Sequence, residues 1–170
     1  VMAGDPDTGI SIMHVVQALD AGAVYKTATR PIGPEETSAE VEADLARIGA
    51  DLLMTVIADI VSGRAIGIPQ EDGASTYAPR LRKEEGTIDW SAAARTIHNQ
   101  VRGLQPWPLA WTSIGGRRLI ILKTRIESGA GTDGAADEDT SSSRGDAATP
   151  GTIVRVSRDV LTVRTGDGVL

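Results

Sequence analysis

The sequence predicts a chain of two parts, an α/β part at residues 1–63 and a mostly β part at residues 87–170. Two short β-rich runs near the start are followed by a stretch with the apolar spacing of helices. A polar segment with several Gly and Pro residues, 64–86, then separates the two parts as an inter-domain linker. Beyond it, β-rich runs around short turns dominate.

In the first part, residues 9–16 and 23–30 are expected to be strands joined by a turn that carries Asp20. The run Thr37-Ser38-Ala39-Glu40 has the capping-box pattern and predicts the start of a helix. Gly49 is expected to interrupt this helix, because Gly in a helix interior costs about 1 kcal/mol relative to Ala. A second helix should therefore follow directly after it.

The second part should open with a helix at about residues 92–103, capped by Asp89 or Ser91. The Gln-Pro-Trp-Pro run after it cannot be helical, because each Pro biases the preceding residue toward extended conformations. Trp107 and Trp111 are the largest apolar groups nearby, so we expect them to anchor a core rather than to stack on bases.

Two hairpins are predicted after this helix. The first pairs Trp111–Ile114 with Arg117–Ile126 around a Gly-Gly turn, and the second pairs Ile153–Val156 with Val160–Val163. Between them, residues 128–149 contain Gly, Ala, Asp, Ser and Thr without an apolar anchor and are expected to be disordered.

Composition excludes several kinds of site. The 170 residues contain no Cys, so disulfides and thiolate metal sites are ruled out. The two histidines, His14 and His98, are far apart and no metal site is predicted; His98 is expected on the polar side of its helix. No apolar run approaches the about 20 residues that cross a membrane, so no membrane partner is expected.

Charge is distributed unevenly along the chain, whose net charge is −6. Residues 1–80 hold 5 basic and 12 acidic side chains, whereas residues 81–127 hold 8 basic and 4 acidic. Such a basic stretch in an acidic chain is a better guide to a polyanionic partner than the total charge.

Asp20 is the candidate for acid–base chemistry. It lies in a small Gly-containing turn between two expected strands, where a carboxylate is held firmly and can face a cleft. The alternative is that Asp20 serves turn geometry alone, which Asp favours through local hydrogen bonds. The residues by themselves leave both interpretations open.

Several motifs together resemble a known enzyme family. GDPDTGISIM (residues 4–13) and ALDAGAVY (residues 18–25) are similar to the Gly-Asp-x-x-Thr-Gly turn and the later Leu-Asp-x-Gly of folate-dependent formyltransferases. GTIDW (residues 86–90) and RGLQPWPLAWT (residues 102–112) resemble the second domain of methionyl-tRNA formyltransferases. The motifs occur in the expected order along nearly the whole chain.

The resemblance implies the end of a Rossmann-like catalytic domain, then an OB-like barrel that binds tRNA. The implied reaction moves a formyl group from 10-formyltetrahydrofolate to methionyl initiator tRNA, without a metal. Asp20 matches the family's catalytic carboxylate, which orients a His and stabilises its protonated form. The backbone near Gln17, Ala18, Leu19 and Asp20 matches the part that holds the pterin ring, whereas Asp5 and Asp7 match only the turn.

The basic residues of the second half are the candidates for tRNA contact. For each one alone a solvated surface charge is the simpler interpretation, whereas for the group we favour a binding patch. The group consists of Arg82, Lys83, Arg95, Arg102, Arg117, Arg118, Lys123 and Arg125. The protein is expected to be a cytoplasmic monomer.

The family's Asn-x-His and Ser-Leu-Leu-Pro motifs lie upstream of the Gly-Asp-x-x-Thr-Gly turn. The chain is therefore expected to be a fragment, truncated at both ends and inactive by itself. Two alternatives stay open. One is another folate-dependent formyltransferase or hydrolase, acting on a sugar amine or on formyltetrahydrofolate, although the Pro-Trp-Pro-x-x-Trp run at residues 106–111 favours the tRNA enzyme. The other is a non-catalytic RNA-binding fragment.

Overall fold

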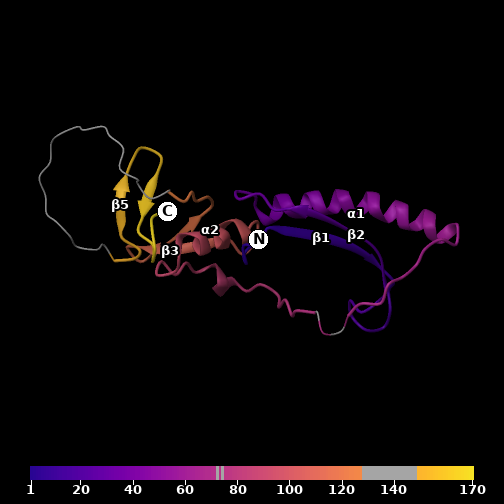
Figure 1. Ribbon diagram of the computed structural model, residues 1–170. Helices are drawn as coiled ribbons and strands as arrows, with labels where there is room; N and C mark the ends of the chain where they lie inside the picture. The colour runs from indigo at the N-terminus through magenta and orange to yellow at the C-terminus, as the bar shows by residue number, and fades with distance from the viewer. Residues whose placement is uncertain (72, 74, 128–148) are drawn as a thin grey trace, which may run out of the picture. The chain divides into compact units, whose positions relative to one another are not determined.

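The computed structural model describes residues 1–71, 73, 75–127 and 149–170 (Figure 1). These residues form two compact units, a first unit made mainly of residues 3–82 and a second unit made mainly of residues 83–170. Apart from Thr149, the predicted disordered loop at 128–149 lies outside the described residues.

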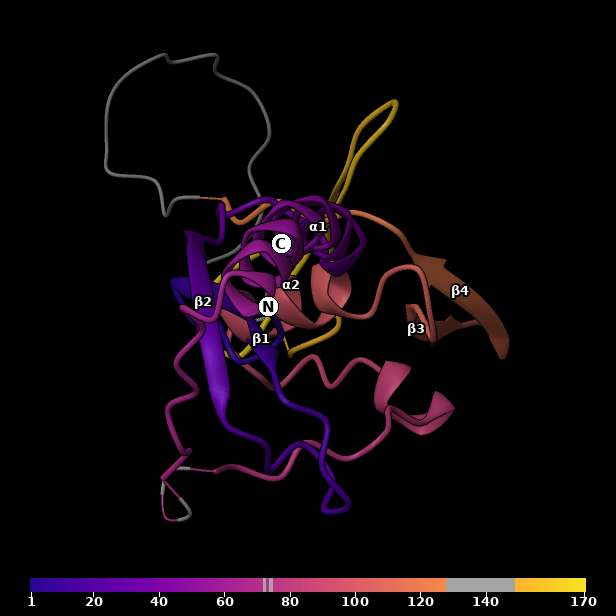
Figure 2. The ribbon, with the colours of Figure 1, turned by 90° about the vertical axis from the view of Figure 1, so that its right-hand side faces the viewer.

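The first unit is a hairpin covered by a helix. Strand β1 (Asp7–Met13) pairs antiparallel with β2 (Val24–Pro31), and α1 (Ser38–Val61) packs against both strands. Figure 1 shows α1 running beside the two strands, and in Figure 2 the helix is seen nearly end-on. The two predicted strands and the turn between them are confirmed, with strand ends displaced by one to three residues.

The predicted capping box begins α1. The Thr37 backbone N–H donates to Glu40 Oε2 at 2.8 Å, and Thr37 Oγ1 accepts from the Glu40 backbone N–H at 3.4 Å. These two bonds satisfy backbone donors that have no partner inside the helix. The helix therefore starts where the sequence pattern places it.

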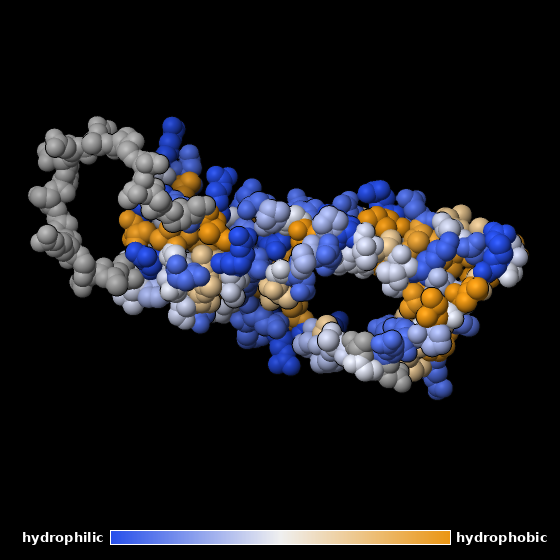
Figure 3. Space-filling view, viewed as in Figure 1, coloured by the Kyte–Doolittle hydropathy of each residue, from blue (hydrophilic) through white to orange (hydrophobic). Residues whose placement is uncertain are grey.

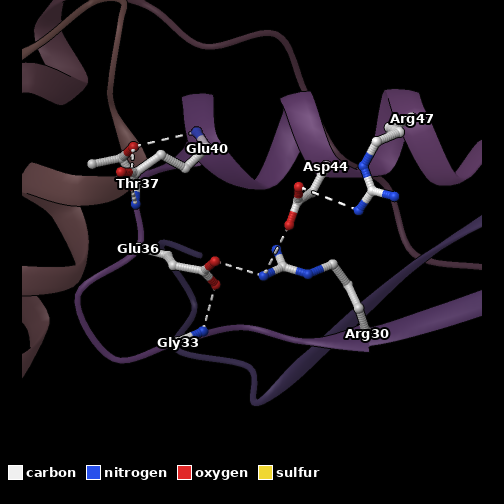
Figure 4. A network of polar contacts seen from close by, with 7 residues as sticks. All are labelled: Arg30, Gly33, Glu36, Thr37, Glu40, Asp44 and Arg47. Atoms are coloured by element: carbon white, nitrogen blue, oxygen red, sulfur yellow. Dashed lines mark hydrogen bonds and ion pairs between the residues drawn. The ribbon is translucent and has the colours of Figure 1, made fainter.

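A polar network fixes the connection between β2 and α1 (Figure 4). Glu36 accepts from Arg30 Nη2 at 2.5 Å and from the Gly33 backbone N–H at 2.6 Å. Asp44 of α1 lies 3.6 Å from Arg30 Nη2 and 3.7 Å from Arg47 Nη2. The Arg30 side chain is half-buried, so this ion-pair network is partly shielded from water.

The predicted break at Gly49 is wrong, because α1 continues through it as a single helix of 24 residues. Gly49 is buried against the hairpin, and a Cβ added there would lie 2.6 Å from Ile10 Cδ1. Close packing of the helix on the strand outweighs the weak helix propensity of Gly, since tertiary contacts supply most helical stability in proteins.

The second unit has its own hydrophobic core. It contains a short 3₁₀ helix, η2 (Lys83–Gly86), and the helix α2 (Ala94–Gly103). The inward face of α2 presents Ile97 and Val101, as its apolar spacing predicts, and Leu104 follows fully buried. The buried cluster comprises Ile88, Ala94, Ile97, Val101, Ala110 and Leu170.

The cap of α2 is not the predicted one. The helix begins at Ala94, and its backbone N–H donates to Asp167 Oδ1 at 2.7 Å. Asp89 instead accepts from the Ser91 hydroxyl at 2.6 Å and from the Ser91 backbone N–H at 2.9 Å. These two hydrogen bonds hold the pKa of the Asp89 carboxyl below its usual range. Asp89 therefore closes a local turn, and a residue distant in sequence caps the helix.

Two further side chains differ from expectation. His98 is buried with 3% exposure, and its Nδ1 lies 3.0 Å from Thr124 Oγ1, so it faces the interior and not the polar side. Trp107 is 52% exposed and does not anchor the core. Trp111 is half-buried, and a Cβ on Gly86 would contact its indole, which agrees better with an anchoring role.

Both predicted hairpins are confirmed, although the second strand of the first one ends at Ile121 and not at Ile126. β3 (Ala110–Ile114) pairs with β4 (Arg117–Ile121), and β5 (Ile153–Val156) pairs with β6 (Leu161–Val163). After β6 the chain turns, and Leu170 exchanges two backbone hydrogen bonds with Val163. Within the described residues each sheet has two strands and no barrel closes, so the OB-like assignment is not established by the strand pairing.

Candidate functional site

The turn between β1 and β2 carries Asp20 on its exposed surface. Asp20 has a φ of +53°, in the left-handed region, where Asp is among the non-Gly residues that occur most readily. The turn closes where the His14 backbone N–H donates to the Ala23 carbonyl at 2.9 Å. The two strands thus present the carboxylate at the end of a hairpin, as the sequence predicts.

Gly22 completes the Leu-Asp-Ala-Gly motif for a steric reason. It is buried, and a Cβ added to it would lie 1.6 Å from the His14 carbonyl oxygen. Any side chain at this position would force the turn open. The glycine of the motif therefore sets the path of the backbone beside Asp20.

The predicted pterin-binding residues lie in the same exposed turn. Gln17, Ala18 and Leu19 are all exposed, and the Leu19 side chain is 91% exposed. Within the described part of the chain, their peptide groups make no hydrogen bond. Exposed backbone donors and acceptors beside an apolar side chain fit a flat heteroaromatic ring with polar edges.

Gln70 contacts this turn, although the sequence pattern does not predict the contact. Its side-chain Nε2 donates to the Asp20 carbonyl at 2.7 Å and to the Gly22 carbonyl at 2.8 Å. Gln70 lies in the polar segment that reads as a linker, and no spacing pattern connects it to Asp20. The contact is visible only once the chain is folded.

The segment before Gln70 pairs with the start of β2. Val24 and Ile68 exchange backbone hydrogen bonds of 2.8 Å in each direction. A Cβ on Gly67 would lie 2.9 Å from Ala23 Cβ, so the two backbones approach closely. The residues 67–70 are consequently attached to the hairpin rather than extended away from it.

Most of the predicted basic residues are exposed. Lys83 lies in η2, Arg95 in the first turn of α2, and Arg82 is the last residue of the first unit. Arg117 and Arg118 begin β4, and Lys123 and Arg125 follow that strand. The exposed members are Arg82, Lys83, Arg95, Arg117, Arg118, Lys123 and Arg125.

Arg102 does not share this exposure. It is only 7% exposed, and its Nε donates to Asn99 Oδ1 at 3.0 Å. A guanidinium in this position is committed to the interior of the second unit, contrary to the surface role expected from the sequence.

Arg117 and Arg118 point to opposite faces of the β3–β4 hairpin, because neighbouring residues of a strand alternate. Arg118 lies opposite Ser113, and its guanidinium carbon is 4.7 Å from the centre of the Trp111 ring. This cation–π contact orients one of the two cations over an aromatic surface.

The described residues contain no cluster of three or more His, Asp or Glu side chains that could hold a metal ion. Over the same residues, no helix is both long and apolar enough to pass through a membrane.

Apolar side chains are exposed along the second half of α1 (Figure 3). The residues that form this exposed apolar face are Leu53, Met54, Ile57, Ile60 and Val61.

Comparison with known proteins agrees with the motifs. The family model for the formyl transferase C-terminal domain matches residues 80–170. A methionyl-tRNA formyltransferase from Sorangium cellulosum (strain So ce56) is 35% identical over 170 residues, covering 100% of this chain and 50% of that protein. One from Solibacter usitatus (strain Ellin6076) is 39% identical over 170 residues, covering 100% and 49%.

The chain thus spans about half the length of the curated relatives that it matches. Among solved structures, HypX from Aquifex aeolicus in complex with tetrahydrofolic acid aligns with a TM-score of 0.70 at 16% identity. That alignment covers 99% of this chain and 27% of HypX, and it shows a shared fold. Because the family model spans more than half of the chain, the protein belongs to the formyl transferase C-terminal domain family.

Proposed function

We propose that the chain acts as part of a methionyl-tRNA formyltransferase, which formylates the amino group of methionyl initiator tRNA. The observation that carries this proposal is the identity of 35–39% to curated methionyl-tRNA formyltransferases along the entire chain. The similarity includes both the turn with Asp20 and the basic second half. The sugar-amine and hydrolase alternatives have no comparable support.

The reaction forms a bond between the methionyl nitrogen and the formyl carbon and breaks the bond from that carbon to the folate nitrogen. One proton moves from the attacking amine to the leaving nitrogen. Bound 10-formyltetrahydrofolate supplies the formyl group. The exposed peptide groups of Gln17, Ala18 and Leu19 would hold its ring, and no metal is required.

Asp20 is the proposed catalytic carboxylate. Its exposed position on a hairpin turn lets it contact a histidine from the part of the relatives that this chain does not span. A carboxylate paired with a histidine orients the ring and stabilises its protonated form. Asp20 therefore acts on the proton transfer and not on the formyl group itself.

The two predicted domains would then have different tasks. Residues 1–63 are proposed to be the end of a Rossmann-like catalytic domain, 64–86 the linker and 87–170 an OB-like domain that binds tRNA. The exposed cations from Arg82 to Arg125 would contact tRNA phosphates, with Arg102 excluded by its burial. We propose a monomer that works in the cytoplasm.

The test is formylation of charged initiator tRNA by three proteins: this chain, the complete enzyme and its Asp20→Asn variant. The amide is nearly isosteric but cannot stabilise a protonated histidine, so turnover should fall by at least about 10²-fold. The chain alone should be inactive, because a catalytic unit that lacks its partners recovers almost nothing.

Asp5→Asn is the matched control, since Asp5 is an exposed carboxylate at the opposite end of the same hairpin and has no proposed role. Its turnover should equal that of the unmodified enzyme. Near-normal turnover by Asp20→Asn, or measurable turnover by the chain alone, would contradict the proposal.

A further inference from the structure

The Gln70 side-chain amide bridges two carbonyl groups of the turn that carries Asp20. Its Nε2 has two hydrogens, and the distances of 2.7 Å to the Asp20 oxygen and 2.8 Å to the Gly22 oxygen use one for each. The two acceptors belong to the peptide group before Ala21 and to the one after Gly22, so a single side chain holds both ends of this dipeptide. Both bonds have normal hydrogen-bond length.

The Asp20 carbonyl belongs to the same residue as the carboxylate. Asp20 has a positive φ, which strains the backbone of a non-Gly residue, although Asp tolerates it better than most. The orientation of the peptide that follows Asp20 is coupled to that φ and to its ψ. A donor that holds this carbonyl consequently constrains the backbone at Asp20 and the direction of the Cα–Cβ bond from which the carboxylate extends.

Gln70 is itself held in place by the hairpin. Ile68, two residues earlier, makes the pair of 2.8 Å backbone bonds with Val24 at the start of β2. Gln70 is therefore anchored to β2, the strand that follows the turn. Its segment pairs with the edge of β2 that does not pair with β1. Gln70 and Asp20 are 50 residues apart in the sequence, and this anchoring brings them together.

We propose that Gln70 is a positioning residue, which holds the Asp20 turn in the geometry that proton transfer needs. The inference rests on the proposed function, in which Asp20 is the catalytic carboxylate. Two carbonyl oxygens require a side chain that donates twice, as an amide does. A glutamate of the same shape can only accept, and it would be repelled by both carbonyls.

The experiment uses the complete enzyme with Gln70→Met, Gln70→Glu, Asp20→Asn and the double variant Asp20→Asn with Gln70→Met. Methionine has the length of glutamine but donates no hydrogen bond. Because small displacements of a catalytic group can lower rates by up to about 10²-fold, kcat of Gln70→Met should fall about 10-fold or more. The kcat of Gln70→Glu should fall by at least the same factor.

The distinguishing measurement is the double variant. A residue that acts through Asp20 has nothing left to position once the carboxylate is an amide, so Gln70→Met should cause no further loss in the Asp20→Asn background. The KM for charged tRNA should stay unchanged, and the thermal midpoint should fall equally in both backgrounds because the same two hydrogen bonds are lost. Glu71→Gln, an exposed neighbour without a proposed role, is the matched control and should keep full activity.

Equal losses from Gln70→Met in both backgrounds would show a general structural role and overturn the inference. Normal kcat in Gln70→Met, with a strong defect in Asp20→Asn, would overturn the inference while leaving the proposed function intact. Normal kcat in Asp20→Asn would overturn both.

Discussion

Asp59 joins the end of α1 to the hairpin beneath it. Its carboxylate lies 2.8 Å from Lys26 Nζ of β2 and 3.3 Å from Arg64 Nη2 after the helix. The hydrogen bond from Lys26 is the largest cause that lowers the pKa of Asp59, and Arg64 acts in the same direction. The pair is partly exposed, so its contribution is small and sensitive to salt.

This shift gives a prediction about acid stability. A carboxyl whose pKa is lower in the folded state contributes stability above its unfolded value of 3.8, and the contribution disappears as pH falls through the folded pKa. Asp59→Asn should therefore lower the free energy of unfolding at pH 6 and make no difference well below pH 3.8. Urea unfolding at several pH values measures this.

The control for Asp59 is Asp51→Asn, an exposed α1 carboxylate whose backbone carbonyl, and not its side chain, accepts from Thr55. It should show no such pH-dependent difference. An Asp59→Asn effect that persists at low pH would assign the loss to something other than the ion pair.

At the scale of elements, the N-terminus of α2 is capped by a residue that is distant in the sequence. Its first turn contains no acidic side chain and Ala93 offers no cap, so the Asp167 carboxylate supplies the acceptor for the Ala94 N–H. The Thr165 hydroxyl also donates to Asp167 at 3.3 Å, while Thr165 Oγ1 accepts from the Gly168 N–H at 3.1 Å. The turn after β6 is thereby tied to the start of the helix.

Asp167→Ala should consequently destabilise the protein by about 1 kcal/mol, the usual cost of losing an N-cap. Asp167→Asn keeps an acceptor oxygen at the same place and should lose less, since only the favourable charge at the helix N-terminus is removed. Chemical denaturation of both variants provides the comparison. Identical stability of Asp167→Ala and the unmodified protein would rule out the capping role.

At the scale of the whole molecule, charge separates along the chain. The first 80 residues are acidic and would repel a polyanion. Residues 81–127 are basic and would attract it. Seven of the eight predicted basic residues are exposed in the structure. The exposed cations lie just before η2, on η2, α2 and β4, and in the segment after β4, so a contact with tRNA would involve several elements.

Replacing Arg117 and Arg118 together by Gln in the complete enzyme should weaken tRNA binding. Each lost phosphate contact reduces the dependence of log K on log salt concentration, and the slope should flatten by about 1–2 units. Folate affinity should not change. The single variants separate the two faces of the hairpin, of which the Arg118 face also carries Trp111.

Arg47→Gln is the control for this experiment, because Arg47 is an exposed cation of the first unit paired with Asp44. It should leave the salt slope unchanged. If the double replacement left the salt slope unchanged, Arg117 and Arg118 would be ordinary surface charges that do not contact tRNA phosphates.

The sequence by itself determined the features that rest on local chemistry. The Gly-Gly turn between β3 and β4, the Thr37–Glu40 capping box, and the turn that carries Asp20 all involve residues close in the chain. Turn geometry, β-alternation and capping act over two to four residues, so a pattern in the sequence is enough to find them. The motifs around Asp20 and Trp107 likewise indicate the family from the sequence alone.

Only the tertiary structure decided the features that depend on distant neighbours. Gly49 stays helical because Ile10 lies against it, and Arg102 and His98 are buried by packing that no local pattern reveals. Asp167 caps a helix 73 residues away, and Gln70 holds a turn 50 residues away. Such contacts form after the chain has folded, because burial and long-range hydrogen bonds depend on where the backbone brings each side chain.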